Sequence, residues 1–186
     1  MSAPGTKATL TALAGALILA LGSGGCDGTA TETSPTGASM GGPLFTVASG
    51  SQSTLLGRAT FSDPSDQTFK VKRITGNWHV EVKATPNLDL AVQRIVFQPG
   101  GQSGWHRHPG PVFIQVVTGT MTFYMSDDPT CAPIVRTAGQ GYLDVGEHAH
   151  IARNESDAPA ENIVVYLAPQ AATLRIDAPD PGNCPF

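Results

Sequence analysis

The segment GQSGWHRHPGP, residues 101–111, places two histidines, His106 and His108, two positions apart. The same spacing returns further along the chain in His148-Ala149-His150. Successive side chains of an extended chain point to opposite faces, so the two rings of each pair point the same way. Neutral imidazole is a common nitrogen ligand of zinc, iron, copper and nickel. The two pairs therefore predict a metal site, against the alternative that they are ordinary exposed loop histidines.

The first histidine pair lies within a longer pattern. Gly100, His106, His108, Val112 and Gly119 are spaced as Gly-x5-His-x-His-x3-Val-x6-Gly. This pattern resembles the first motif of the cupin superfamily, Gly-x5-His-x-His-x3-Glu-x6-Gly. Val112 stands at the position where the family has its glutamate.

The second histidine pair lies within a similar pattern. Gly139, His150 and Asn154 match the second cupin motif, Gly-x5-Pro-x-Gly-x2-His-x3-Asn, whereas Val145 stands in place of the proline and Glu147 in place of the glycine. The two motifs together cover residues 100–154. The resemblance implies an all-β fold, the double-stranded β-helix or jelly-roll barrel of cupins.

The resemblance also implies a set of metal ligands, namely His106, His108 and His150. Because Val112 replaces the carboxylate, a divalent ion held by three neutral imidazoles keeps its full charge, which favours Lewis acidity and open coordination. Some cupin thiol and diketone dioxygenases hold their metal in this way, and three-histidine sites also hold zinc. The implied cofactor is a divalent transition metal: Fe, Ni, Cu, Zn or Mn.

A fourth ligand could come from the turn before His150. His148 shares a face with His150 if the strand is already extended there, and Glu147 or Asp144 could reach inward from the turn. We rank His148 above Glu147. The alternative is that these are solvated turn side chains, which is favoured because polar residues are common in turns.

Strand-like segments fill the rest of the chain. Residues 78–83 alternate apolar and polar side chains, which would leave His79 on the surface. Residues 88–97, 112–117, 121–125 and 163–167 are apolar runs of strand length, and residues 118–120 form a tight turn between two of them. No amphipathic helix of ten residues is evident, so the pattern independently favours an all-β barrel or double sheet.

The alternation of side chains also describes the interior of the barrel. If Val112 points inward, Ile114 and Val116 share its face, and Arg107 points away from the two ligand histidines. These residues would form an apolar core in any small barrel. A metal surrounded by them would suit a small, largely apolar or aromatic ligand.

The N-terminal segment, residues 1–25, resembles a signal peptide. An apolar run at residues 10–21 follows a single basic residue, Lys7, and is short for a membrane span. Small residues then precede Cys26 as in the lipoprotein processing box, although Ser23 replaces the usual leucine. The expectation is lipidation of Cys26, with ordinary signal cleavage as the alternative. The chain would then be exported, to the periplasmic side of a bacterial membrane or as a secreted protein.

Residues 26–53 are rich in Gly, Ser, Thr, Ala and Pro, which predicts a flexible linker. Residues 54–186 are long enough for one core, so a single cupin domain is expected there.

Cys131 and Cys184 remain as an even pair if Cys26 carries lipid. In an exported chain this parity predicts a disulfide, which a chain-entropy estimate values at about 4 kcal/mol. The alternative, a cysteine ligand to the metal, is disfavoured because both cysteines lie in loop-like sequence far from the histidines.

Charge and missing motifs exclude several function classes. The chain has 11 Lys and Arg against 15 Asp and Glu, which argues against nucleic acid as a partner. The sequence has no phosphate-binding glycine loop before a helix and no Gly-x-Ser-x-Gly motif. The expected partner is a small-molecule ligand, contact with a membrane is expected only through an N-terminal lipid anchor, and oligomerisation stays open.

Three functions fit these observations. The first is a metal-dependent oxidoreductase of the dioxygenase type. The second is a non-catalytic lipoprotein that binds a metal or small molecule. The third is a Zn- or Mn-dependent hydrolase, isomerase or decarboxylase, which needs a general base near the metal; the local candidates are Glu147, Asp144, His148 and Tyr142.

Overall fold

The computed structural model describes residues 45–63, 68–72, 79–83 and 87–186, and this part of the chain consists of strands, turns and loops. The all-β expectation is confirmed, because none of these residues lies in a helix. It follows that the described part has no helix long and apolar enough to cross a membrane. The expected signal peptide, Cys26 and Trp78 lie outside the described residues.

Twelve strands are formed by the described residues, and every apolar run expected as a strand lies in one of them. The strands are β1 (Ser49–Phe61), β2 (Thr68–Lys72), β3 (His79–Lys83), β4 (Leu88–Gln102), β5 (His106–Arg107), β6 (Val112–Thr118), β7 (Thr120–Met125), β8 (Ile134–Thr137), β9 (Gly141–Asp144), β10 (His150–Arg153), β11 (Ala160–Pro169) and β12 (Ile176–Asp177).

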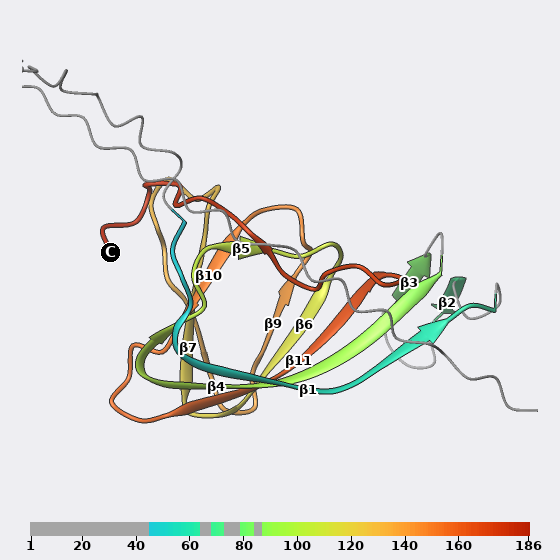
Figure 1. The fold of residues 1–186 in the computed structure, drawn as a ribbon, viewed down its shortest axis with the longest axis horizontal. Coiled ribbons are helices and arrows are strands. Elements are labelled where there is room, and N and C mark those ends of the chain that lie inside the picture. Colours follow the sequence, from blue (N-terminus) through green and yellow to red (C-terminus); the bar gives the residue numbers. More distant parts are fainter. Residues whose placement is uncertain (1–44, 64–67, 73–78, 84–86) are drawn as a thin grey trace, which may run out of the picture. The chain divides into compact units, whose positions relative to one another are not determined.

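Ten of these strands form one antiparallel sheet that curls into a nearly closed barrel (Figure 1). The main path runs β12-β5-β10-β4-β11-β6-β9, with β1 added on β4 and with β7 bridging β10 and β8. The long strand β4 pairs with β1 along one edge and with β11 along the other. β2 and β3 pair separately as a two-stranded sheet.

β1 begins at Ser49, inside the stretch expected to be linker. Its first residues are polar and small, but Ser51 and Ser53 pair in register with Phe97 and Ile95 of β4. Backbone hydrogen bonds to a neighbouring strand do not require apolar side chains, so composition alone gives no sign of this strand end.

The link between β6 and β7 is a corner and not a hairpin. β6 pairs with β11 and β9, whereas β7 pairs with β10 and β8, so the two strands are not partners. Gly119 turns the chain with a φ of 75°, and a Cβ added there would lie 2.8 Å from the Cα of Ala160. A glycine is required because both the backbone angle and the close approach exclude a side chain.

The barrel interior is filled by apolar side chains from both halves of the sheet. Val112, Ile114 and Val116 of β6 are buried while the residues between them are exposed, which confirms the expected face of this strand. Met121 and Phe123 of β7 belong to the same core cluster.

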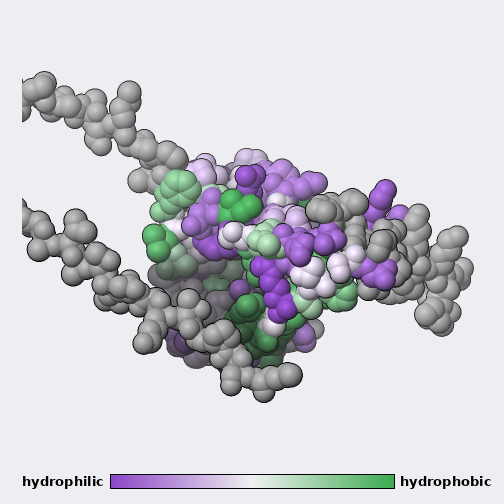
Figure 2. All heavy atoms as spheres, turned by 45° about the vertical axis from the view of Figure 1, so that its right-hand side comes forward, coloured by the Kyte–Doolittle hydropathy of each residue, from purple (hydrophilic) through white to green (hydrophobic). Residues whose placement is uncertain are grey.

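The outer surface of β6 and β9 keeps some apolar side chains, including Phe113 and Leu143, each about half exposed. Figure 2 shows one face of the molecule, on which hydrophobic and hydrophilic residues are interspersed. Oligomerisation stays a prediction.

The C-terminal segment pairs with the strand that carries His106. β12 pairs antiparallel with β5, with Ile176 opposite Arg107 and Asp177 opposite His106. The expected disulfide joins Cys131 to Cys184, with a Cα–Cα distance of 5.3 Å. We call residues 174–184 the C-terminal strap, because this segment runs alongside β5 and is anchored by the disulfide.

Candidate metal centre

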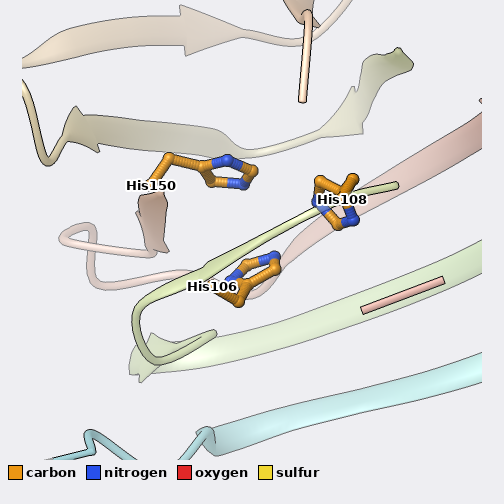
Figure 3. Close-up of side chains that lie close together, drawn as sticks. All are labelled: His106, His108 and His150. Carbon is orange, nitrogen blue, oxygen red and sulfur yellow. The ribbon is translucent and has the colours of Figure 1, made fainter. Parts of the chain in front are cut away.

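Three histidines, His106, His108 and His150, meet at one place inside the barrel wall. Their ring centroids lie 4.8 Å (His106–His108), 4.5 Å (His106–His150) and 5.2 Å (His108–His150) apart. One nitrogen from each ring lies within 4.8 Å of the other two, and all three residues are buried. Figure 3 shows the rings turned toward a common space, two from the segment around β5 and one from β10.

The local backbone explains why these side chains converge. His106 and His150 are opposite each other in the register of β5 and β10. Gly104 precedes β5 with a φ of 69°, and a Cβ there would collide with the carbonyl oxygen of Thr46. Glycine therefore allows the tight entry into β5 that aims both His106 and His108 inward.

The hydrogen bonds of two rings fix which nitrogen can bind a cation. His106 Nδ1 lies 2.8 Å from the carbonyl oxygen of Gly104, and His108 Nδ1 lies 2.6 Å from that of Leu174. A carbonyl oxygen only accepts, so each Nδ1 carries the proton and each Nε2 is left with a lone pair. Backbone carbonyls that hold the outer nitrogen in this way are typical of histidines that bind metals.

Burial keeps these histidines neutral. Burial, followed by the charge of His150, lowers the pKa of His106 far below its ordinary value. The same two causes lower the pKa of His108 to about 4. Neutral imidazole is the form that binds a metal, so both rings are ready to do so at neutral pH.

His150 is accompanied by a buried carboxylate, that of Asp144. Asp144 Oδ2 lies 3.1 Å from His150 Nδ1 and 3.8 Å from His108 Nε2. Apart from this approach to each other, Oδ2 and His150 Nδ1 have no hydrogen-bond partner, although both are buried. Burial raises the pKa of Asp144, but His150 and the N–H of Gly146 outweigh it, so the pKa stays below its usual range and the group is ionised.

Asp144 lies at the position across from the missing glutamate. Val112 of β6 and Asp144 of β9 are partners in the strand register. Gly146 has a φ of 86° and donates its N–H to Asp144 Oδ1 at 2.9 Å, which fixes the carboxylate at the end of β9. The residue of this turn with a left-handed backbone is thus Gly146. The second cupin motif would place the glycine one position later, at Glu147.

The other candidates of the turn lie elsewhere. His148 is exposed and lies 3.6 Å from Asp127, outside the group of three histidines. Glu147 is exposed as well. Tyr142 donates its hydroxyl to Met125 Sδ, and burial followed by the charge of Asp144 raises its pKa to about 12, so it is protonated and unsuited to act as a base.

Asn154, which ends the second motif, has a structural role. It is fully buried, and its side-chain nitrogen donates to the carbonyl oxygens of Phe97 and Ala158. These bonds tie the end of β10 to β4 and so support the strand that carries His150.

A cavity of about 230 Å³ opens beside His106 and His108. Ile95, Phe97 and Leu174 form its apolar part, in place of the Val112 face expected from the sequence, and Gln93, Tyr166 and Arg175 also line it. Sequence patterns gave no sign of these three polar residues, because each stands singly within a strand or loop with no motif around it.

These residues fit a divalent transition metal. Three imidazoles, two of them with an Nε2 lone pair fixed by backbone bonds, provide the nitrogen donors that such ions prefer. Ligand nitrogens of one ion lie up to about 4 Å apart, twice the usual metal–nitrogen distance of about 2.1 Å, so small ring movements suffice. The orphaned Asp144 Oδ2 adds a negative charge beside the donors.

Comparison with known families gives one match: residues 93–166 match the model of the cupin domain. The matched segment contains all three histidines and runs from β4 to β11. This match supports membership of the cupin superfamily, as the two histidine motifs predict. No curated protein matches the chain in sequence.

Several solved structures are similar to this chain at low sequence identity. A polyketide cyclase from Streptomyces resistomycificus is 14% identical, with 72% of this chain and 77% of that chain covered and a TM-score of 0.46. A double-stranded β-helix protein from Klebsiella pneumoniae is 20% identical, with coverage of 48% and 75% and a TM-score of 0.41. The cupin domain of an XRE-family transcriptional regulator from Enterobacter cloacae is 14% identical, with coverage of 65% and 98% and a TM-score of 0.41.

Proposed function

We propose that this chain, in which residues 93–166 match a cupin domain, binds one divalent transition metal through His106, His108 and His150 and acts on a small molecule. The observation that carries this proposal is the convergence of three buried imidazoles, two of them with Nε2 left free to bind an ion.

The reaction class that we propose is that of a dioxygenase-type oxidoreductase. A redox-active ion on three histidines offers open positions for a substrate and for O2. The chain's own residues support this chemistry by orientation and burial. The backbone carbonyls of Gly104 and Leu174 hold the rings of His106 and His108. Trp105 and Ile151 are almost fully buried, so they keep water from the rear of β5 and β10.

We also propose that the chain is an exported lipoprotein, with residues 1–25 as signal peptide and Cys26 as the lipidated residue. The supporting observations are the apolar run at residues 10–21 and the small residues before Cys26. The Cys131–Cys184 disulfide agrees with an oxidising compartment. Mass spectrometry of the N-terminal peptide tests this: a diacylglyceryl group on Cys26 is expected, and an unmodified N-terminus after Cys26 would contradict it.

Metal analysis of protein purified without a histidine tag tests the metal site. We expect about one ion per chain, and replacement of His106, His108 or His150 by alanine should remove most of it, since two imidazoles chelate far more weakly than three. His148→Ala is the matched control and should keep the metal, because His148 is exposed and contacts Asp127. A His106→Ala protein with a full complement of metal would refute the ligand set.

Oxygen consumption with small thiols, phenols and carboxylic acids then tests the reaction class. Substrate-dependent O2 uptake supports the dioxygenase. Retention of metal with no turnover would identify a binding protein, and zinc with hydrolytic turnover would identify the third class considered from the sequence.

A further inference from the structure

Among the described residues that line the cavity beside His106 and His108, one side chain is cationic and none is an aspartate or glutamate. The cationic side chain is Arg175, in the C-terminal strap. Asp177 accepts a hydrogen bond from Arg175 Nε at 2.6 Å, and its side chain is 66% exposed. Among the residues that the structure describes, no other group accepts a hydrogen bond from Arg175. The terminal nitrogens of the guanidinium therefore remain available for a ligand.

The side-chain amide of Gln93 also presents donors in this cavity. The hydroxyls of Ser53 and Tyr166 both donate to Gln93 Oε1, at 3.2 and 2.9 Å. Because this oxygen is used by two donors, the Gln93 side chain has its amide N–H groups left to offer. A cavity lined by an arginine and an amide nitrogen selects a ligand group that accepts hydrogen bonds.

Arg175 shares its cavity with the metal-binding rings. The lining includes Arg175 together with His106, His108 and Tyr166. A ligand held by the guanidinium would therefore lie in the same cavity as two of the three candidate metal ligands.

Size and shape restrict the ligand further. About 230 Å³ lies below the volume of pockets that hold drug-sized ligands, which argues against a nucleotide. Ile95, Phe97 and Leu174 provide an apolar wall for a short hydrocarbon or one ring. One guanidinium matches one planar carboxylate through two parallel hydrogen bonds, whereas a doubly charged phosphate calls for more positive charge.

We propose that this cavity binds a small monocarboxylate, with its carboxylate on Arg175 and Gln93 and its hydrocarbon part against Ile95, Phe97 and Leu174. The ligand would lie beside the ion held by His106 and His108. This inference rests on the proposed function for the neighbouring ion, and it adds a carboxylate to the small, largely apolar or aromatic ligand that the sequence suggests.

Calorimetric binding of matched probes tests the proposal. Benzoate and propionate should bind the full-length protein, whereas benzamide and propionamide, which have nearly the same shape and no charge, should bind at least tenfold more weakly. Equal affinity for the acids and the amides would overturn the proposal. Tighter binding of inorganic phosphate than of benzoate would overturn the choice of a monocarboxylate.

Variants assign the effect to Arg175. Arg175→Gln should weaken benzoate binding by about ten- to a hundredfold, and Arg175→Lys should weaken it less, because it keeps the charge and loses the fork. Arg107→Gln is the matched control, since Arg107 is exposed on the other face of β5, and it should bind benzoate as the original chain does. Unchanged benzoate affinity in a folded Arg175→Gln protein would overturn the assignment; circular dichroism and melting temperature verify folding.

The metal content of each preparation separates this inference from the proposed function. Protein that carries no metal but still prefers benzoate to benzamide through Arg175 would support the carboxylate site and refute the metal site. Protein that carries one ion but shows no preference for the acid would refute the carboxylate site alone.

Discussion

Asp144 of β9 and Val112 of β6 are partners in the strand register, and this pair shows which residue supplies the negative charge of the site. The carboxylate that the motif lacks at residue 112 is present on the neighbouring strand, with Oδ2 buried 3.1 Å from His150 Nδ1. A carboxylate beside the outer nitrogen of a ligand histidine aligns the ring and raises its basicity.

We predict that Asp144→Asn weakens metal binding by about ten- to a hundredfold, the usual cost of losing such a partner. The variant should fold, because Asn keeps an oxygen to accept from the N–H of Gly146. Competition with a fluorescent metal chelator measures the affinity. Asp127→Asn is the control, since Asp127 faces the exposed His148, and equal losses in both variants would show that Asp144 has no special role.

A second prediction concerns pH and the metal-free protein. The pKa of His108 is lowered to about 4 in the folded chain, against an ordinary value of 6.5. The unfolded chain therefore takes up a proton that the folded chain does not, and stability falls as the pH drops from about 6.5 toward 4. The loss near pH 5 should be about 2 kcal/mol for this histidine.

Urea unfolding at pH 7 and pH 5, with a chelator present, measures this dependence. The double variant His106→Gln, His108→Gln removes two of the buried titrating groups and should show a much smaller loss. Equal losses in the variant and the original chain would mean that other groups control acid stability.

At the residue scale, i, i+2 spacing predicts two histidine pairs that each share a face, and the resemblance to the cupin motifs implies which three of the four histidines converge. It could not rank Asp144 above His148 as the neighbour of the site. That order depends on where the turn after β9 begins, and the left-handed residue is Gly146 and not residue 147. The sequence could not predict the roles of Arg175 and Gln93, because no local pattern links them to the histidines.

Among the elements, the turn at residues 118–120 is predicted in its position, whereas the partners of the strands that it joins are not. An apolar run, a Thr-Gly-Thr segment and another apolar run predict a tight turn between two strands. The turn is present at Gly119, but β6 and β7 pair with different strands, which the local sequence does not specify. The strand β12 is not predicted either, since two residues show no periodicity.

We predict that Gly119→Ala destabilises the fold by about 2 kcal/mol or more, because it combines a positive φ with a collision against Ala160 and Pro159. Gly139→Ala isolates the first effect: Gly139 has a φ of 84° but nothing within 4 Å of the added Cβ, so about 1 kcal/mol is expected. Chemical denaturation of both variants gives the comparison. Similar losses of stability in the two variants would show that β11 moves aside from residue 119 at little energetic cost.

For the molecule as a whole, cysteine parity predicted the Cys131–Cys184 disulfide, but not what the bridge anchors. It ties down the strap that supplies the Leu174 carbonyl to His108 and Arg175 to the cavity. The sequence predicts no part for the C-terminal tail in the site, because the pairing of β12 with β5 joins distant parts of the chain.

We predict that the double variant Cys131→Ser, Cys184→Ser loses up to about 4 kcal/mol of stability, as expected for a bridge that closes a long loop. It should also bind metal more weakly than the loss of stability explains, because a loosened strap no longer holds the ring of His108. Urea denaturation and chelator competition measure the two effects at a temperature where the variant is folded. Full metal affinity in the variant would show that the strap stays docked without its bridge.

The position of the strap along the chain has a consequence for biosynthesis. Residues 174–177 are synthesised after all the strands from β1 to β11, yet they orient His108 and close its side of the cavity. The barrel can assemble before the metal centre is finished, because pairing of β12 with β5 comes last in the order of synthesis. With the proposed export and the proposed metal site, the ion would be acquired only after the strap has paired with β5, so the metals of the compartment in which folding ends would decide which one the protein carries.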